Sequence, residues 1–275
     1  MTIQITIIRI EGYGPWTLTL GSDREAQLQM LQSRIYHDTQ QLFSEKECLV
    51  YSNRFDEYFA ISNGLSIQDH IIIQKELANL HTNLKLSMTI GKGITPFEAN
   101  LNVHKSRQAG KILAEGTSIF GQAILSTSCS SSKLSLSSSQ SISNLRALDS
   151  EFVQIMHIDV NNSRKISLDL SPYEITHLIM KVYALLSEEF LKKGSLTFFI
   201  GGDNFMVISN GVSKEDAETI INKVAGSMGV KLNCGIGIGN TGRKAANNAT
   251  KALDTIRNLR EKGKSHSVYE IQCIE

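Results

Sequence analysis

Cysteine is scarce in this sequence, and the cysteines that it has stand far apart. Cys48, Cys129, Cys234 and Cys273 include no CxxC pair. This spacing argues against a disulfide framework and against a cysteine-based zinc site, and is typical of separate intracellular thiols. An excess of charge of one sign is lacking as well, since 28 Lys and Arg stand against 27 Asp and Glu, for a net charge of +1. Without a long basic patch, a nucleic acid polymer is not an expected partner.

Two further absences narrow the class of protein. No apolar run is long enough to span a membrane, and the N-terminus has no charged segment before an apolar stretch. The motif GxxxxGKS, or its threonine variant, is also missing, which excludes a P-loop enzyme. With 41% hydrophobic residues, the chain can bury two cores, and we expect a cytoplasmic protein without a membrane partner.

What the sequence does have is an internal repeat. The string ISNGLS at 61–66 returns as ISNGVS at 208–213, which is 147 residues later. Asp56 and Asp203 are separated by the same 147 residues. A constant offset between distant positions is the signature of a duplicated unit. The 275 residues are therefore two copies of one module, which agrees with the length expected of two domains.

Each module is predicted to contain both strands and helices. The β-branched run 3–10 is typical of a buried strand, and apolar residues at helical spacing indicate a helix between Leu28 and Leu42. Ser66 begins an S-x-x-D helix start signal, and Ser213 begins its counterpart. The expected order in each copy is β-α-β-β-α-β, the split βαβ arrangement. The expected strands are 3–10, 49–53, 58–62 and 84–90, then 152–160, 196–200, 205–209, 231–236 and 267–271.

The domain boundaries follow from the repeat. The first module is predicted to cover 1–115 and the second 151–275, joined by a linker over 116–150. Residues 126–143 in that linker are mostly serine, which is typical of a flexible spacer.

Acids occupy comparable places in both modules. Glu11 follows the first strand and Asp56 lies in the hairpin turn, and Asp159 and Asp203 are their counterparts. In a split βαβ fold the end of the first strand lies beside the hairpin tip, so we expect the two acids of each module to face each other. Adjacent carboxylates repel unless a cation lies between them, and Mg²⁺ takes carboxylates together with phosphate oxygens. Turn aspartates also bond their own backbone, but the recurrence favours a metal site.

Glycines accompany these acids. Gly12 and Gly14 follow the first acid, in a loop that can present backbone N–H groups to phosphates. Gly201 and Gly202 precede Asp203 and permit a close approach of ligand or backbone. The run GIGIG at 235–239 has the wrong spacing for a dinucleotide fingerprint. It is expected to be a strand packed tightly on a helix, without a cofactor.

The turn GGDNF at 201–205 resembles the GGDEF turn of diguanylate cyclases and, more broadly, the palm domain of class III nucleotidyl cyclases. Further strings over nearly the whole chain are together similar to the archaeal GTP cyclohydrolase III family. These strings are IQIT at 3–6, YGPWT at 13–17, QSR at 32–34, RFD at 54–56, ID at 158–159 and FFIGGDNFM at 198–206.

The resemblance implies an α+β chain of two tandem ferredoxin-like palm domains that pair as a pseudo-dimer. It further implies a magnesium-dependent enzyme that opens the imidazole ring of GTP to 2-amino-5-formylamino-6-(phosphoribosylamino)pyrimidin-4-one and releases phosphate. That product feeds riboflavin and deazaflavin coenzyme synthesis, and the family resemblance suggests a homotetramer. The sequence departs from the expected pattern at Glu11, where an aspartate is expected, and in its serine-rich connector, where a charged helix is expected.

The expected site residues combine the resemblance with the pattern of acids and glycines. Asp159, Asp203 and His157 are predicted to be catalytic. The predicted metal ligands are Asp159, Asp203, Glu11 and Asp56. The predicted nucleotide-binding residues are Gly12, Tyr13, Gly14, Trp16, Arg34, Arg54, Gly201, Gly202 and Asn204.

For three of these residues, a purely structural role is an alternative to the functional one. His157 lies two residues before Asp159 on a strand and thus on the same face, so it is either a general base or a satisfied core histidine. Arg34 either holds phosphate or is a solvated surface charge. Trp16 either stacks on a base or fills the core. At the level of the whole protein, a nucleotidyl cyclase with a ribose hydroxyl as nucleophile, or a nucleotide-sensing regulator without turnover, remains an alternative to the cyclohydrolase.

Overall fold

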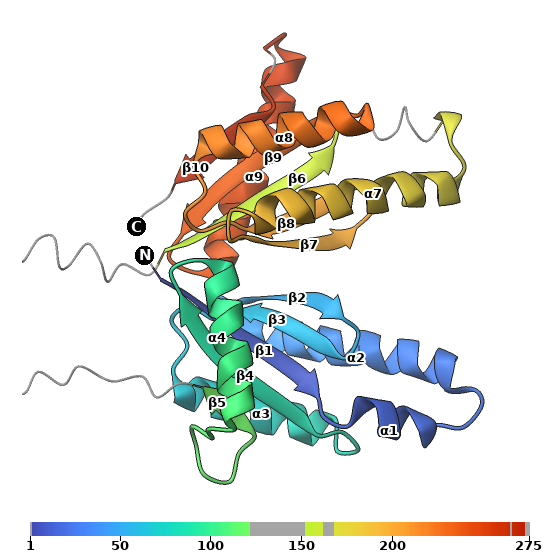
Figure 1. Ribbon diagram of the computed structural model, residues 1–275, viewed down its shortest axis with the longest axis vertical. Coiled ribbons are helices and arrows are strands. Elements are labelled where there is room, and N and C mark those ends of the chain that lie inside the picture. The colour runs from blue at the N-terminus through green and yellow to red at the C-terminus, as the bar shows by residue number, and fades with distance from the viewer. Residues whose placement is uncertain (1, 122–151, 162–167, 265, 273–275) are drawn as a thin grey trace, which may run out of the picture.

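The protein is described by a computed structural model that covers residues 2–121, 152–161, 168–264 and 266–272 (Figure 1). The first half contains β1 (Ile3–Ile10), α1 (Tyr13–Leu18), α2 (Arg24–Ser44), β2 (Leu49–Arg54), β3 (Glu57–Ile61), α3 (Ile67–Leu80), β4 (Leu86–Gly93), α4 (Pro96–Ala109) and β5 (Ile119–Gly121). The second contains β6 (Val153–Val160), α7 (Pro172–Leu191), β7 (Leu196–Gly201), β8 (Asn204–Ile208), α8 (Lys214–Met228), β9 (Leu232–Gly239), α9 (Gly242–Glu261) and β10 (Val268–Gln272).

Each half is built on one five-stranded sheet. The strand orders are β2-β3-β1-β4-β5 and β10-β9-β6-β8-β7. Within each sheet, four strands are antiparallel in the order of a split βαβ unit, and the fifth strand pairs in parallel at one edge. The prediction of an α+β chain with two tandem ferredoxin-like halves is confirmed.

The sequence-based prediction differs from the structure in two places. Residues 12–16 are expected as a loop, but Tyr13–Leu18 form the short helix α1, which begins after Gly12 in the left-handed conformation. The strand β5 falls inside the expected linker, because Ile119 is fully buried and pairs with Met88 of β4. The serine-rich segment 126–143 lies outside the described residues.

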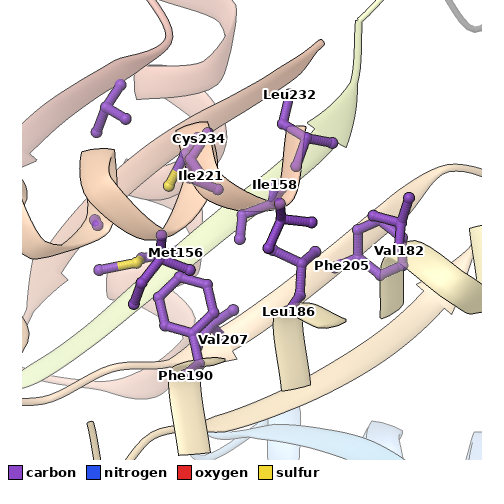
Figure 2. Packing of buried hydrophobic residues seen from close by; sticks show 14 of the residues in the cluster. Met156, Ile158, Val182, Leu186, Phe190, Phe205, Val207, Ile221, Leu232 and Cys234 are labelled. Carbon is purple, nitrogen blue, oxygen red and sulfur yellow. The ribbon is translucent and has the colours of Figure 1, made fainter. Parts of the chain in front are cut away.

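Helices cover both faces of each sheet (Figure 1). α2 and α3 pack on one face of the first sheet and α4 on the other, and α7, α8 and α9 take the corresponding places in the second half. The two polar helix starts predicted from sequence are in place: the Ser66 hydroxyl accepts a bond from the Asp69 amide, and Ser213 does the same for Asp216. Figure 2 shows the second-half core, where Phe190 and Phe205 pack among aliphatic side chains of β6 and α8.

The glycine run of β9 allows α9 to lie directly on the strand. A Cβ atom at Gly237 would stand 2.1 Å from the carbonyl oxygen of Ala245 and 2.1 Å from the amide nitrogen of Ala249. Gly235 is equally close to α9, with 2.1 Å to the Ala249 oxygen. The prediction that residues 235–239 form a strand packed tightly on a helix is confirmed.

The halves meet through a third hydrophobic cluster to which both sheets contribute. The rings of Tyr51 on β2 and Phe198 on β7, which are equivalent positions of the repeat, stack with centroids 4.8 Å apart. An approximate two-fold relation also appears in the backbone, where the amide of Phe97 donates to Gly194 O (2.9 Å) and the amide of Arg243 donates to Glu47 O (3.1 Å). The predicted pseudo-dimer is thus the arrangement observed.

None of the helices in the described part of the chain is both long and apolar enough to cross a membrane.

Candidate functional site

The end of the first strand lies beside the hairpin turn in each half, as predicted. The amide of Ile10 donates to the carbonyl of Asp56 (3.0 Å), and the amide of Val160 donates to the carbonyl of Asp203 (3.3 Å). Strand pairing fixes this arrangement, because β1 runs antiparallel to β3 and β6 runs antiparallel to β8. Four acids are therefore held at two equivalent sheet edges.

The carboxylates at the strand ends are directed toward arginines of the following helices. Glu11 accepts hydrogen bonds from the Ser87 hydroxyl and from Arg107 of α4. The expectation is that Glu11 faces Asp56; its carboxylate is directed toward α4 instead, because the long glutamate side chain reaches Arg107.

The predicted equivalence of Glu11 and Asp159 is wrong by two residues, because the backbone bonds equate Ile10 with Val160 and therefore Glu11 with Asn161. The second-half acid is also buried. Asp159 is 6% exposed, and its two oxygens accept bonds from Asn233 Nδ2 and Arg257 Nη2, each at 2.6 Å. The expected partner Asp203 instead accepts a bond from Asn204 Nδ2 (2.9 Å). Asp159 is opposite Asn204 in the strand register, one residue beyond the turn aspartate, so its side chain is turned toward α9.

Asp56 has a more open environment. Its side chain is 24% exposed, and Arg54 Nε lies 3.6 Å from Asp56 Oδ1. The pKa of Tyr13 is raised by burial and then by the charge of Asp56, and burial and Asp56 raise the pKa of Tyr58 as well. The carboxylate therefore lies within electrostatic range of both phenols, between the hairpin and α1.

His157 lies on the same face as Asp159, as predicted from strand alternation. Its Nε2 donates to Asn204 Oδ1 (3.1 Å), and its Nδ1 then accepts from the Thr250 hydroxyl (3.1 Å). Burial lowers the pKa of the imidazole. Both ring nitrogens therefore have partners in a neutral ring, which is the arrangement of a satisfied histidine. A role as general base stays a prediction.

A pocket of about 330 Å³ lies between α1, α2 and the segment after α3. We call it the α1–α2 pocket. It contains Trp16 and Arg34, two residues predicted to bind nucleotide. The complete lining is Trp16, Leu20, Gln27, Leu31, Arg34, Leu80, His81, Thr82, Asn83 and Leu84.

This pocket adjoins the first acidic edge. The helix α1, which carries Trp16, begins two residues after Glu11. On the other side of the pocket, Leu84 precedes Lys85, whose carbonyl accepts a bond from the Glu11 amide (2.8 Å). The ring of Tyr13 lies 6.0 Å from that of Trp16, and its hydroxyl accepts a bond from Gln32 (2.5 Å). The backbone on both sides of the pocket is thus connected to the strand end at Glu11.

Sequence reasoning missed the pocket residues after α3. His81 is buried, with its Nε2 2.9 Å from Asp38 Oδ2 on α2, and Asn83 follows it in the lining. No motif marks these residues, because they approach Trp16 only when α3 packs beside α2.

The remaining predicted nucleotide-binding residues are distributed over both halves. Gly12 begins α1 with φ of 64°, and Gly14 is exposed. Arg54 is 63% exposed and lies near Asp56 and Glu57. Gly201 and Gly202 have φ of 113° and 61°, a backbone conformation that favours glycine. Residues 162–167 lie outside the described residues.

Among the four candidate metal ligands, the first-half pair fits a hard cation better. The side chains of Glu11 and Asp56 are 25% and 24% exposed, and their oxygens suit Mg²⁺. The side chain of Asp159 is 8% exposed and has both oxygens engaged. In the described part of the chain, no three His, Cys, Asp or Glu side chains are grouped as a ready-made metal site. Two protein carboxylates with water and substrate oxygens are nevertheless a sufficient set for magnesium.

Sequence comparison relates almost the whole chain to known proteins. The profile of the family described as GTP cyclohydrolase III matches residues 3–270. GTP cyclohydrolase III of Methanocaldococcus jannaschii is 38% identical over 256 residues, which are 93% of this chain and 88% of that protein. The Methanothermobacter thermautotrophicus protein of the same name is 35% identical over 258 residues, or 93% of this chain and 94% of its relative.

Solved structures similar to this chain include GGDEF domains. The GGEEF domain of a diguanylate cyclase from Vibrio cholerae is 12% identical with a TM-score of 0.35, over 49% of this chain and 89% of that one. The FimX GGDEF domain from Pseudomonas aeruginosa is 15% identical with a TM-score of 0.34, over 49% of this chain and 92% of that one.

Proposed function

This chain belongs to the GTP cyclohydrolase III family, and we propose that it is a hydrolase that opens the imidazole ring of GTP. The family predicted from the sequence strings is thereby confirmed. The observation that supports a substrate site in this particular chain is the α1–α2 pocket, which contains Trp16 and Arg34 and is connected through the backbone to the strand end at Glu11.

In this proposal the guanine base occupies the α1–α2 pocket. The indole of Trp16 offers a surface for stacking, and the Arg34 guanidinium and the Asn83 amide offer polar groups to the edge of a purine. The triphosphate then extends toward the backbone amides that follow Gly12. Closure of the pocket by apolar side chains such as Leu31 and Leu84 limits access of water to the base.

We assign Glu11 and Asp56 as the residues that would hold Mg²⁺. Bound there, the ion supplies a positive charge that polarises phosphate oxygens and lowers the pKa of a coordinated water. Arg107, which donates to Glu11, orients that carboxylate. Asp56 has freedom to adjust because its side chain is partly exposed and its contact with Arg54 is long.

The proposed reaction consumes three waters. One water adds to C8 of guanine and the C8–N9 bond breaks, with the carbon retained as a formyl group. Two waters cleave the two phosphoanhydride bonds, and two phosphates leave. The product is 2-amino-5-formylamino-6-(phosphoribosylamino)pyrimidin-4-one, a precursor suited to riboflavin and deazaflavin synthesis. We further propose a cytoplasmic homo-oligomer as the active form.

Incubation of the full chain with GTP and magnesium tests this function. We expect loss of purine ultraviolet absorbance, a product with the mass of the formylamino pyrimidine monophosphate, and release of inorganic phosphate. Addition of chelator should stop turnover and excess magnesium should restore it. Formation of a cyclic nucleotide would favour a nucleotidyl cyclase, and tight binding of intact GTP would favour a sensor. Either result would contradict the proposed reaction, and full turnover in metal-free buffer would contradict the metal assignment.

A further inference from the structure

A second pocket lies on the opposite face of the first sheet, under α4. It has a volume of about 240 Å³, and we call it the α4 pocket. Its polar walls include two arginines, Arg9 from β1 and Arg107 from α4, with His104 one turn before Arg107. The complete lining is Ile7, Arg9, Glu57, Ser87, Thr89, Asn100, Leu101, Val103, His104 and Arg107. Strand alternation separates it from the α1–α2 pocket, because Ile7 and Arg9 face α4 whereas Ile8 and Ile10 belong to the core beneath α2 and α3.

In the second half, the residues equivalent to the lining of the α4 pocket bond to one another. The strand register places His157 at the position of Ile7 and Asp159 at the position of Arg9, and Thr250 corresponds to His104. There, the imidazole of His157 bonds directly to Thr250 and to Asn204, each at 3.1 Å. These bonds join the positions equivalent to Ile7, Glu57 and His104, which line the α4 pocket in the first half. At the position of Arg9, Asp159 is bonded to Asn233 and Arg257.

The first half differs by introducing positive charge. Where the second half has the buried Leu253, the first has Arg107. Its guanidinium lies 4.6 Å from the centroid of the Phe120 ring, and its Nη1 donates to the Ser87 hydroxyl (3.3 Å). The Arg107 side chain is 27% exposed and paired with Glu11, so the first half keeps a positive charge facing the pocket where the second half has an apolar side chain.

The existing ion pairs leave donors free at both arginines. Arg9 uses Nε (2.8 Å) and Nη2 for Glu57, and Arg107 uses Nη2 for Glu11. Within the described residues, the Arg9 Nη1 and Arg107 Nε groups have no hydrogen-bond acceptor. Glu57 also lines the pocket, and its two oxygens are bonded to Arg9 and Asn53.

We propose that the α4 pocket is a binding site for a phosphate-sized oxyanion. Guanidinium groups bind such ions through charge-assisted hydrogen bonds. The Ser87 and Thr89 hydroxyls, the Asn100 amide and the His104 imidazole supply further polar contacts. An ion bound to Arg107 shares that side chain with Glu11, whose carboxylate lies on the same face of the sheet and also accepts a bond from the Ser87 hydroxyl.

Titration calorimetry of the full chain with inorganic phosphate tests this site. One phosphate per chain should bind saturably, both alone and with a non-hydrolysable GTP analogue present, because the two pockets are on opposite faces. Arg9→Gln should weaken phosphate binding by about 10- to 100-fold, the loss expected for charged hydrogen bonds. His104→Gln should weaken it in the same direction. The matched control is Lys105→Gln, which changes an exposed charge next to His104 on α4 and should leave the affinity unchanged.

Three results would overturn the proposal: no saturable binding of phosphate, displacement of phosphate by the GTP analogue, or wild-type affinity in a folded Arg9→Gln protein. Displacement would assign the ion to the triphosphate part of the GTP site. If Arg9→Gln does not fold, the phosphate affinity of His104→Gln is compared with that of the wild type instead. That variant loses no hydrogen bond within the described residues, so wild-type affinity for phosphate in it would equally overturn the site.

Discussion

At the scale of single residues, Asp56 and Asp203 occupy the same turn of two copies of one hairpin, yet their surroundings differ. The Asp56 carboxylate lies beside two tyrosines and next to the α1–α2 pocket. Asp203 bonds the neighbouring Asn204, and its strand-end partner Asp159 is bonded to Arg257. The sequence repeat makes Asp56 and Asp203 equivalent, whereas their contacts favour Asp56 as part of the active site.

Substitution of the two aspartates in parallel tests that difference. Asp56→Asn should lower kcat by about 100-fold or more, because loss of a metal ligand at a charged transition state costs roughly 3 kcal/mol. Asp203→Asn should reduce kcat much less. Steady-state GTP turnover and circular dichroism on both proteins provide the measurement. The opposite order of effects would return the active site to the second half, with Asp159 and Asp203 as its acids.

His70 is a second residue whose environment gives a testable consequence. It is fully buried, its Nδ1 donates to Ser66 O (2.7 Å), and its Nε2 accepts from the Thr6 hydroxyl (2.7 Å). Burial lowers the pKa of this imidazole in the folded protein. Its contribution to stability is therefore present above the unfolded pKa near 6.5 and is lost as the pH falls toward the folded pKa.

The free energy of unfolding should consequently drop between about pH 7.5 and about pH 5.5, and should drop less in His70→Gln. Urea unfolding at both pH values gives the comparison. His157, whose pKa is also lowered by burial, contributes in the same direction in both proteins and cancels. An equal pH dependence in wild type and variant would show that His70 does not titrate differently on folding.

At the scale of elements, the contact between β9 and α9 depends on glycine. The strand must present a bare backbone at Gly235 and Gly237 because helix backbone atoms lie within 2.1 Å of any added Cβ. Gly91 and Gly93 serve α4 in the same way, with 2.4 Å to the backbone of Ala99. Glycine in a strand interior is otherwise unfavourable, so its repetition at equivalent positions indicates close helix packing.

Gly237→Ala should destabilise the protein by about 2–3 kcal/mol or more, because α9 must move off the sheet. The control is Gly226→Ala in α8, where no atom lies within 4 Å of the added Cβ. That change should stabilise by about 0.5–1 kcal/mol through helix propensity. Urea unfolding of both variants measures the difference. Similar free energies of unfolding for the two variants would mean that α9 can move away from β9 at little energetic cost.

At the scale of the whole molecule, the same backbone hydrogen bond joins the two halves twice, but a different type of residue accepts it in each half. Gly194 (φ 75°) accepts the bond from Phe97, and the corresponding acceptor Glu47 has φ of 58°. Within the described residues Glu47 is the one non-glycine residue with positive φ. The interface therefore requires a left-handed residue on both sides, and only the second half supplies a glycine there.

Glu47→Gly should raise stability by up to about 1 kcal/mol, since the relief of left-handed strain exceeds the added chain entropy. Its side chain contributes little, because the contact with Arg243 is 3.8 Å long and exposed. Gly194→Ala should cost at least about 1 kcal/mol, since its Cβ would stand 3.0 Å from Thr95 Oγ1 in a left-handed backbone. Thermal unfolding of the full chain checks both signs. Destabilisation by Glu47→Gly would show that this carboxylate holds the halves together.

The sequence by itself determined the duplication, the order of strands and helices, the helix starts at Ser66 and Ser213, and the glycine strand at 235–239. These features depend on residues near one another in the chain, where side-chain periodicity, capping and turn geometry act locally. The backbone neighbourhood of the first strand end and the hairpin turn was also predictable, because register places them side by side.

Only the tertiary structure decided what those acids contact and where a ligand fits. Arg107 and Arg257 approach their carboxylates from 96 and 98 residues away, and His81 reaches the α1–α2 pocket from the far end of α3. Such partners are selected by how helices pack on the sheet, which no local pattern encodes. The fold thus follows from short-range regularity, whereas the two pockets follow from side chains that meet only after the sheets, their helices and the two halves have assembled.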